Sequence, residues 1–178
     1  MYDIITQLVG LVGVALAISA YQFKRHSVVM VMIAISDFCF VVQFFMLGAY
    51  AGSIVNFISI FRNLVFAYLI KHKKKVLPYT VLFCSITLVA IILTWAGPIC
   101  ILAILGNVAI SLAFSVENPK LLRYLSLPSS FCWIIYDIYY FSLGGILMET
   151  FTVISIFVAL FRLRKSEKKS NPPTQEQH

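Results

Sequence analysis

The chain has 178 residues, of which 61% are hydrophobic and only 12% are charged, with a formal net charge of +7 and a mean hydropathy of +0.93. Because a soluble domain carries about a quarter charged residues, this composition excludes a soluble enzyme, a nucleic-acid-binding module, a disordered protein and a secreted disulfide scaffold. It predicts a polytopic membrane protein. At about 20 apolar residues per transmembrane helix, with short turns, the chain has room for about seven spans.

Seven apolar runs follow one another along the chain, at residues 4–20, 28–47, 53–70, 77–95, 99–116, 121–142 and 146–163. No Lys or Arg precedes the first run, so it lacks the basic start of a secretory signal peptide and is predicted to be a retained helix. Residues 165–178 are polar and contain two prolines, so we predict a disordered tail there.

Basic residues follow the first, third, fifth and seventh runs, whereas the turns at 49–52, 96–98 and 143–145 contain none. Of the 14 Lys and Arg residues, only Arg62 lies outside this pattern. Basic residues concentrate in cytoplasmic loops. The pattern therefore predicts seven transmembrane helices with the N-terminus outside the cell and the tail in the cytoplasm.

The two halves of the chain resemble each other. Residues 9–24 align with 105–120, an offset of 96, and residues 36–75 align with 129–168, an offset of 93. The fold class that we expect is an all-α membrane protein with two parallel three-helix units, at residues 1–75 and 98–164, joined by a linker helix at 76–97. Parallel repeats of this kind occur in transporters.

Two opposite charges fall at a similar depth on neighbouring spans. Asp37 precedes the turn at Gly48 by 11 residues, and Arg62 follows Gly52 by 10, so helical rise places both about 15 Å from the turn. Charged side chains inside a bilayer are costly and usually pair. We therefore predict a structural Asp37–Arg62 ion pair, with a substrate-binding Arg62 as the alternative.

A second set of polar residues predicts a solute pocket. Asn56, Ser59 and Asn63 share one helix face, and the repeat places Glu149 opposite Asn56 and Thr152 opposite Ser59. The full set of candidate substrate-binding residues is Asn56, Ser59, Asn63, Asn107, Trp133, Glu149 and Thr152. Because burial favours the protonated form of a carboxyl group, Glu149 and Asp137 are candidate proton sites. For Asp137, an equal alternative to a proton site is that its carboxyl group lies at the membrane–water interface, where headgroup water hydrates it.

The chain resembles the YgjV-type bacterial inner-membrane proteins over residues 8–70. The residues that carry this resemblance are Tyr21-Gln22 with Lys24, Leu47-Gly48-Ala49 with Gly52, Asn56, and the pair Arg62-Asn63. The 3+1+3 layout is similar to that of the SWEET and PQ-loop transporters, in which an asparagine on the third helix of each unit lines the pocket. The matching positions here are Asn56 and Glu149, and Gln22 lacks the preceding proline of the PQ motif.

Three classes of function are compatible with these features. The preferred one is an inner-membrane transporter or facilitator of a small, sugar-like or other polar solute, with membrane lipids as its other partners. The second is a receptor, chaperone or regulatory partner of the same fold. A membrane enzyme is the weakest, because the sequence has no HExxH motif and no Gly-x-Ser-x-Gly motif. We expect no catalytic residue, metal, cofactor or nucleic acid, and the oligomeric state is left open.

Overall fold

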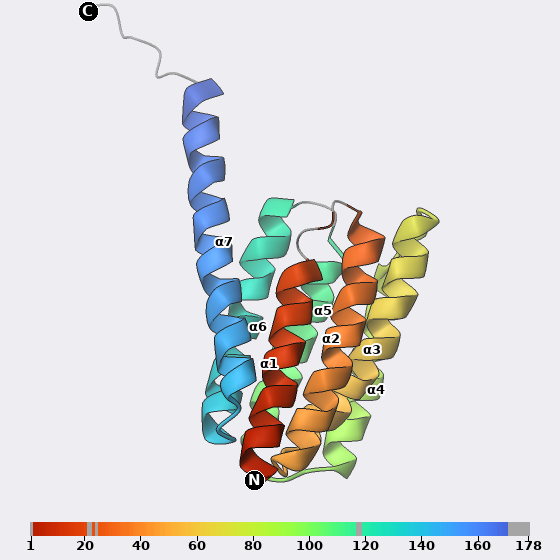
Figure 1. The fold of residues 1–178 in the computed structure, drawn as a ribbon. Helices are drawn as coiled ribbons and strands as arrows, with labels where there is room; N and C mark the ends of the chain where they lie inside the picture. Colours follow the sequence, from red (N-terminus) through yellow and green to blue (C-terminus); the bar gives the residue numbers. More distant parts are fainter. Residues whose placement is uncertain (1, 21–22, 24, 117–118, 171–178) are drawn as a thin grey trace, which may run out of the picture.

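The computed structural model describes residues 2–20, 23, 25–116 and 119–170, and over these residues the chain is helical with short connections (Figure 1). The seven helices are α1 (Tyr2–Ala20), α2 (His26–Met46), α3 (Tyr50–Lys71), α4 (Leu77–Leu93), α5 (Cys100–Phe114), α6 (Pro119–Tyr139) and α7 (Leu143–Ser170). Each helix therefore overlaps one predicted apolar run.

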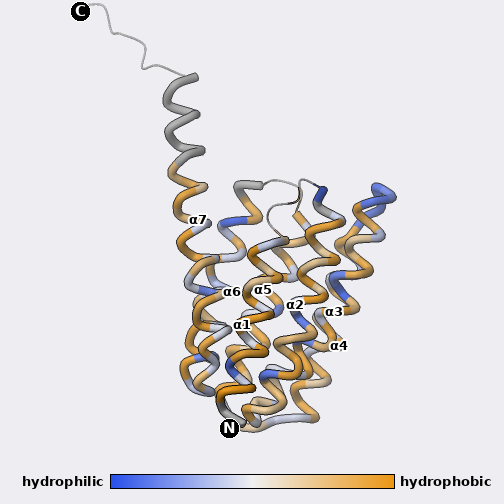
Figure 2. The backbone as a smooth tube through the Cα atoms, viewed as in Figure 1, coloured by the Kyte–Doolittle hydropathy of each residue, from blue (hydrophilic) through white to orange (hydrophobic). Residues whose placement is uncertain are grey.

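Within the described residues, three helices are long and apolar enough to cross a membrane, at Ser27–Met46, Tyr50–Lys71 and Leu143–Phe161. Three shorter apolar helices lie at Ile4–Ala20, Leu77–Leu93 and Cys100–Phe114. Apolar residues dominate along all of them (Figure 2). The outward-facing side chains are largely hydrophobic, as expected of a surface that meets lipid rather than water.

The helices form a ring around a shared interior. α2 packs between α1 and α3, and α6 packs between α5 and α7. The ring closes where α7 meets α1 and where α3 meets α5, while α4 packs against both α3 and α5 (Figure 1). This arrangement directs one face of several helices into a common centre, where buried polar side chains gather.

The α2–α3 and α6–α7 turns have the same backbone pattern. Each contains one residue with a left-handed φ, Gly48 at +73° and Phe141 at +54°. The next backbone N–H then bonds a carbonyl five residues earlier, at 2.9 Å in both turns, as in a Schellman motif. Glycine adopts this conformation without strain, whereas phenylalanine does not.

The ring of helices has two ends. The turn end contains the connections at 47–49, 94–99 and 140–142, and the basic-loop end contains the connection at 72–76. α7 continues past the expected boundary at residue 164 as far as Ser170, and its 28 residues are about 42 Å long at 1.5 Å per residue. The rest of the predicted tail, 171–178, lies outside the described residues.

Candidate functional site

A cavity of about 140 Å³ lies in the centre of the ring and is called the central cavity. Six of the seven residues predicted to bind a solute line it, namely Asn56, Ser59, Asn107, Trp133, Glu149 and Thr152. The cavity wall also contains the four predicted charged residues Asp37, Arg62, Asp137 and Glu149. Asn63, the seventh predicted residue, does not line the cavity, and the structure gives it another position.

Arg62 lies at the cavity wall with only 3% of its surface exposed. Its Nη1 donates to Asn107 Oδ1 at 2.6 Å and to Ser111 Oγ at 2.8 Å. Its Nε and Nη2 both donate to Asn63 Oδ1 at 3.2 Å. The ring of Phe114 lies 5.7 Å from the guanidinium carbon. The guanidinium is therefore held by neutral oxygens from α3 and α5.

Asn63 is the link between Arg62 and Asp37. Its Nδ2 donates to Asp37 Oδ2 at 2.7 Å, while its Oδ1 accepts from Arg62. An amide can do both, because it carries a donor and an acceptor, whereas a carboxylate only accepts and a guanidinium only donates. The predicted direct Asp37–Arg62 ion pair is therefore corrected: the structure joins the two residues through the Asn63 amide.

The same network ties three helices together. Asn107 Nδ2 donates to Thr87 Oγ1 on α4 at 2.9 Å, and Ser59 Oγ donates to Asn107 Oδ1 at 3.2 Å. Asn107 thus both lines the cavity and joins α3, α4 and α5. Thr87 and Ser111 were not singled out from the sequence. Ser111 follows Asn107 by four residues, and this helical spacing is the signal that could have identified it.

The carboxyl groups of the second half have a different environment. Asp137 on α6 is 1% exposed, and its Oδ1 has no hydrogen-bond partner. Glu149 on α7 is partly buried and lines the same cavity. Among the described residues, no Lys, Arg or His forms an ion pair with either one. The structure therefore brings two acidic side chains to one cavity wall, while the hydrogen bonds of Arg62 on the same wall go to Asn63, Asn107 and Ser111.

Aromatic rings lie between the halves near the turn end. The rings of Phe44 on α2 and Trp133 on α6 stack with centroids 6.1 Å apart, and Tyr136 packs edge-on against both at 5.8 and 5.4 Å. Tyr136 Oη accepts a hydrogen bond from the Gly52 N–H at 2.7 Å. These contacts join α6 to α2 and α3, and Phe44 and Trp133 also line the central cavity.

α1 and α7 also meet at the turn end. A Cβ at Gly144 would lie 2.7 Å from the Gly10 carbonyl carbon, so only glycine permits this approach. Gln7 Nε2 donates to the Phe141 carbonyl at 2.9 Å, and Gln7 Oε1 accepts from the Leu143 N–H at 3.0 Å. α1 and α7 are therefore held together at the turn end by both backbone contact and hydrogen bonds.

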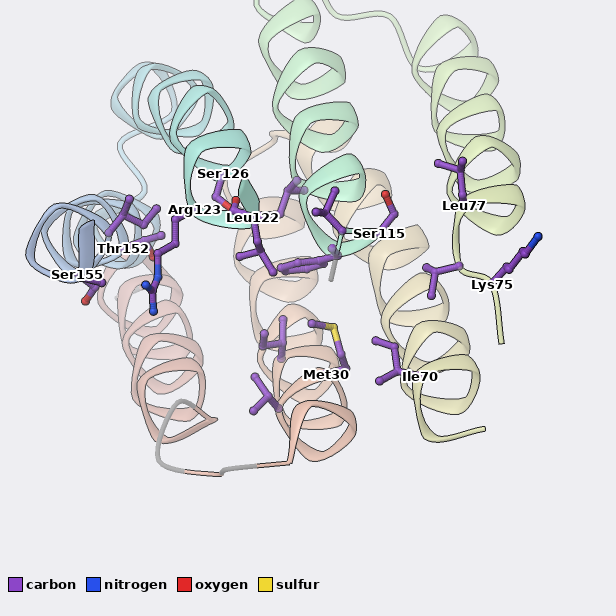
Figure 3. A pocket seen from close by; sticks show the side chains of 18 of the residues that line it. Met30, Ile70, Lys75, Leu77, Ser115, Leu122, Arg123, Ser126, Thr152 and Ser155 are labelled. Carbon is purple, nitrogen blue, oxygen red and sulfur yellow. The ribbon is translucent and has the colours of Figure 1, made fainter. Parts of the chain in front are cut away.

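A much larger cavity, of about 1380 Å³, lies at the basic-loop end and is called the vestibule. Figure 3 shows its lining side chains, with Met30 on α2, Leu122 on α6 and Thr152 on α7 around one space. Its wall is mainly apolar and includes the basic residues Lys73, Lys74, Lys75 and Arg123. Four residues line both cavities and form the wall between them: Ile33, Ile110, Phe114 and Thr152.

Comparison with known proteins gives one positive result. Neither a search of curated proteins nor a search of solved structures finds a match. Residues 4–167 match the Imp-YgjV family, described as "Bacterial inner membrane protein", so the match extends well beyond the predicted range of 8–70. The Tyr21-Gln22 and Lys24 part of the quoted motif lies outside the described residues. This integral protein of the bacterial inner membrane belongs to the Imp-YgjV family.

Proposed function

We propose that this protein is a small-solute transporter or facilitator that binds its solute in the central cavity. The observation that carries the proposal is the asymmetry of access. Toward the turn end, α1 and α7 meet at Gly10 and Gly144, and the Phe44 and Trp133 rings stack. At the other end, four residues line both the central cavity and the vestibule. Tight packing toward one end and a wide vestibule next to the other are what we expect of a carrier that faces one side of the membrane.

An internal duplication is the second part of the proposal. Ser36 Oγ donates to the Gly13 carbonyl at 2.7 Å, and Ser129 Oγ donates to the Gly106 carbonyl at 2.8 Å. The two serines are 93 residues apart, and so are the two glycines. This is the offset that aligns the later helices. This supports two equivalent three-helix units, α1–α3 and α5–α7, linked by α4 as in the SWEET-like layout. It also favours an offset of 93 for the first helices, in place of the 96 inferred from sequence.

The lining of the central cavity follows the same offset. The pairs of lining residues that it relates are Ala17 and Ile110, Ser36 and Ser129, Asp37 and Ser130, Phe40 and Trp133, Phe44 and Asp137, Asn56 and Glu149, and Ser59 and Thr152. A cavity shared by two related units is the usual place for substrate in transporters built from repeats. The positive-inside pattern would turn the vestibule toward the cytoplasm.

Alternating access can be tested before any solute is known. Ser59→Cys, in a chain whose four native cysteines are replaced by serine or alanine, places one thiol in the central cavity. Membrane-impermeant methanethiosulfonate reagents are added to either side of oriented vesicles. A transporter must expose this thiol to both sides in turn, so we expect modification from each.

A cross-link supplies the matched control. Gln7→Cys with Leu143→Cys, joined by a short bis-methanethiosulfonate, should hold α1 and α7 together at the turn end. Reagent added from the turn-end side should then no longer modify the Ser59→Cys thiol, whereas reagent added from the basic-loop end should still modify it. Reduction of the cross-link should restore modification from the turn-end side. Reaction from one side only, unaffected by the cross-link, would contradict transport and favour the receptor or partner-protein alternative.

A further inference from the structure

The charges around the central cavity do not balance. Arg62 and Asp37 are connected through Asn63 and account for one positive and one negative charge. Asp137 and Glu149 remain, on the opposite unit, without an ion-pair partner among the described residues. Either a bound cation or bound protons must offset these carboxylates, because an unpaired charge inside a membrane protein is costly.

Asp137 is the more constrained of the two acids. It is 99% buried, since 1% of its surface is exposed, and its Oδ1 has no hydrogen-bond partner. Its carboxylate lies directly over the Cα of Gly145, where a Cβ would overlap it. The group is thus fixed at the cavity wall, and its buried Oδ1 has no donor among the described residues. A positive charge inside the cavity would offset this carboxylate through space.

The rest of the cavity wall determines which kind of cation fits. Phe40, Phe44 and Trp133 line the cavity together with Asp137 and Glu149. Aromatic ring faces attract cations, and rings around a site are the usual receptor for alkylated ammonium groups. A strongly hydrated metal ion would instead require a shell of oxygen ligands. The combination of rings and carboxylates favours an organic cation.

Cavity size limits the ligand further. An engineered protein cavity of about 150 Å³ holds one benzene molecule, and the central cavity is of similar volume, about 140 Å³. Tetramethylammonium and choline are of comparable size, whereas a hexose is considerably larger. The volume of the central cavity therefore fits a small alkylated ammonium compound.

We propose that the central cavity binds a small alkylated ammonium compound, with Asp137 and Glu149 as counter-charges and Phe40, Phe44 and Trp133 around the cationic group. This inference rests on the proposed function only in using the same cavity: binding of such a cation can occur whether or not the protein transports it.

The test compares charged and uncharged ligands of one shape. Purified wild-type protein in detergent is titrated with choline and with its carbon analogue, in which a tert-butyl group replaces the trimethylammonium group. Sodium chloride is added so that every titration has the same ionic strength, because a change in ionic strength would by itself alter electrostatic interactions. Tryptophan fluorescence and the unfolding temperature report binding, because a ligand that binds only the folded state raises its stability.

We expect choline to bind at least tenfold more tightly than the carbon analogue. Glu149→Gln and Asp137→Asn should each weaken choline binding at least tenfold, whereas Glu149→Asp, which keeps the charge, should retain most of it. Trp133→Leu should weaken choline binding while leaving the folded state intact by gel filtration. Equal responses to choline, the analogue and sodium chloride, or no response to choline by folded wild-type protein, would overturn the proposal and leave protons as the occupants.

The two proposals fail in different ways. If choline binds as expected but the Ser59→Cys thiol reacts from one side only, the cation site stands and transport does not. If that thiol reacts from both sides but choline and its analogue behave alike, transport stands and the solute is not an alkylated ammonium compound.

Discussion

Asn63 is the residue whose removal tests the central network most directly. Asn63→Ala deletes a 2.7 Å bond to Asp37 and two 3.2 Å bonds from Arg62, leaving two ionisable side chains short of partners. Side-chain hydrogen bonds in membrane proteins contribute about 0.6 kcal/mol on average and about 1.7 at most. If the short bond contributes the largest value and each long bond contributes the average, Asn63→Ala should lower the free energy of unfolding by about 3 kcal/mol.

Asn56→Ala is the matched control. Asn56 lies two turns earlier on α3 and donates only to the Gly52 carbonyl of its own helix at 2.9 Å. Its removal should cost less than about 1 kcal/mol. Unfolding in mixed sodium dodecyl sulfate and dodecyl maltoside micelles, followed by tryptophan fluorescence, gives both free-energy differences. Equal losses in the two variants would refute the bridging role of Asn63.

Three further predictions use the same unfolding measurement. Ser36→Ala and Ser129→Ala each remove one buried bond to a glycine carbonyl and should each cost about 1 kcal/mol; a loss confined to one of them would argue against equivalent units. Phe141 has a left-handed backbone φ and is 77% exposed, so Phe141→Gly should relieve strain and stabilise the protein by up to about 1 kcal/mol. Gly48→Ala should destabilise the protein, because alanine is strained at the positive φ of this position. The opposite signs would show that backbone strain does not govern the stability of these turns. Gly144→Ala forces its Cβ against the α1 backbone and should cost about 1–3 kcal/mol, and wild-type stability in this variant would mean that the turn end is not tightly closed.

The position of most cavity residues along the helices could be predicted from the sequence. Counting residues from a turn gives depth, because each helical residue rises by 1.5 Å. This is why Asn56, Asn107 and Glu149 were placed in a common pocket, and the structure has all three lining the central cavity. The same reasoning placed Asp37 and Arg62 at similar depths.

The partners of the charged residues could not be predicted in the same way. Depth does not give the rotation of a helix about its axis, and that rotation decides whether Arg62 faces Asp37 or the oxygens of α5. Asn63 was assigned to the pocket because it shares a helix face with Asn56 and Ser59. In the structure its amide instead turns to the neighbouring α2, where it reaches Asp37.

The membrane class, the seven helical segments and the family could all be predicted from the sequence, because composition and the length of apolar runs depend only on the order of residues. The close approach of α1 and α7 at the turn end and the vestibule at the basic-loop end became visible only in the folded chain. Those features depend on how closely α1 and α7 approach and where aromatic rings from α2 and α6 meet. Such contacts join residues more than 80 positions apart, and local sequence patterns carry no information about their geometry.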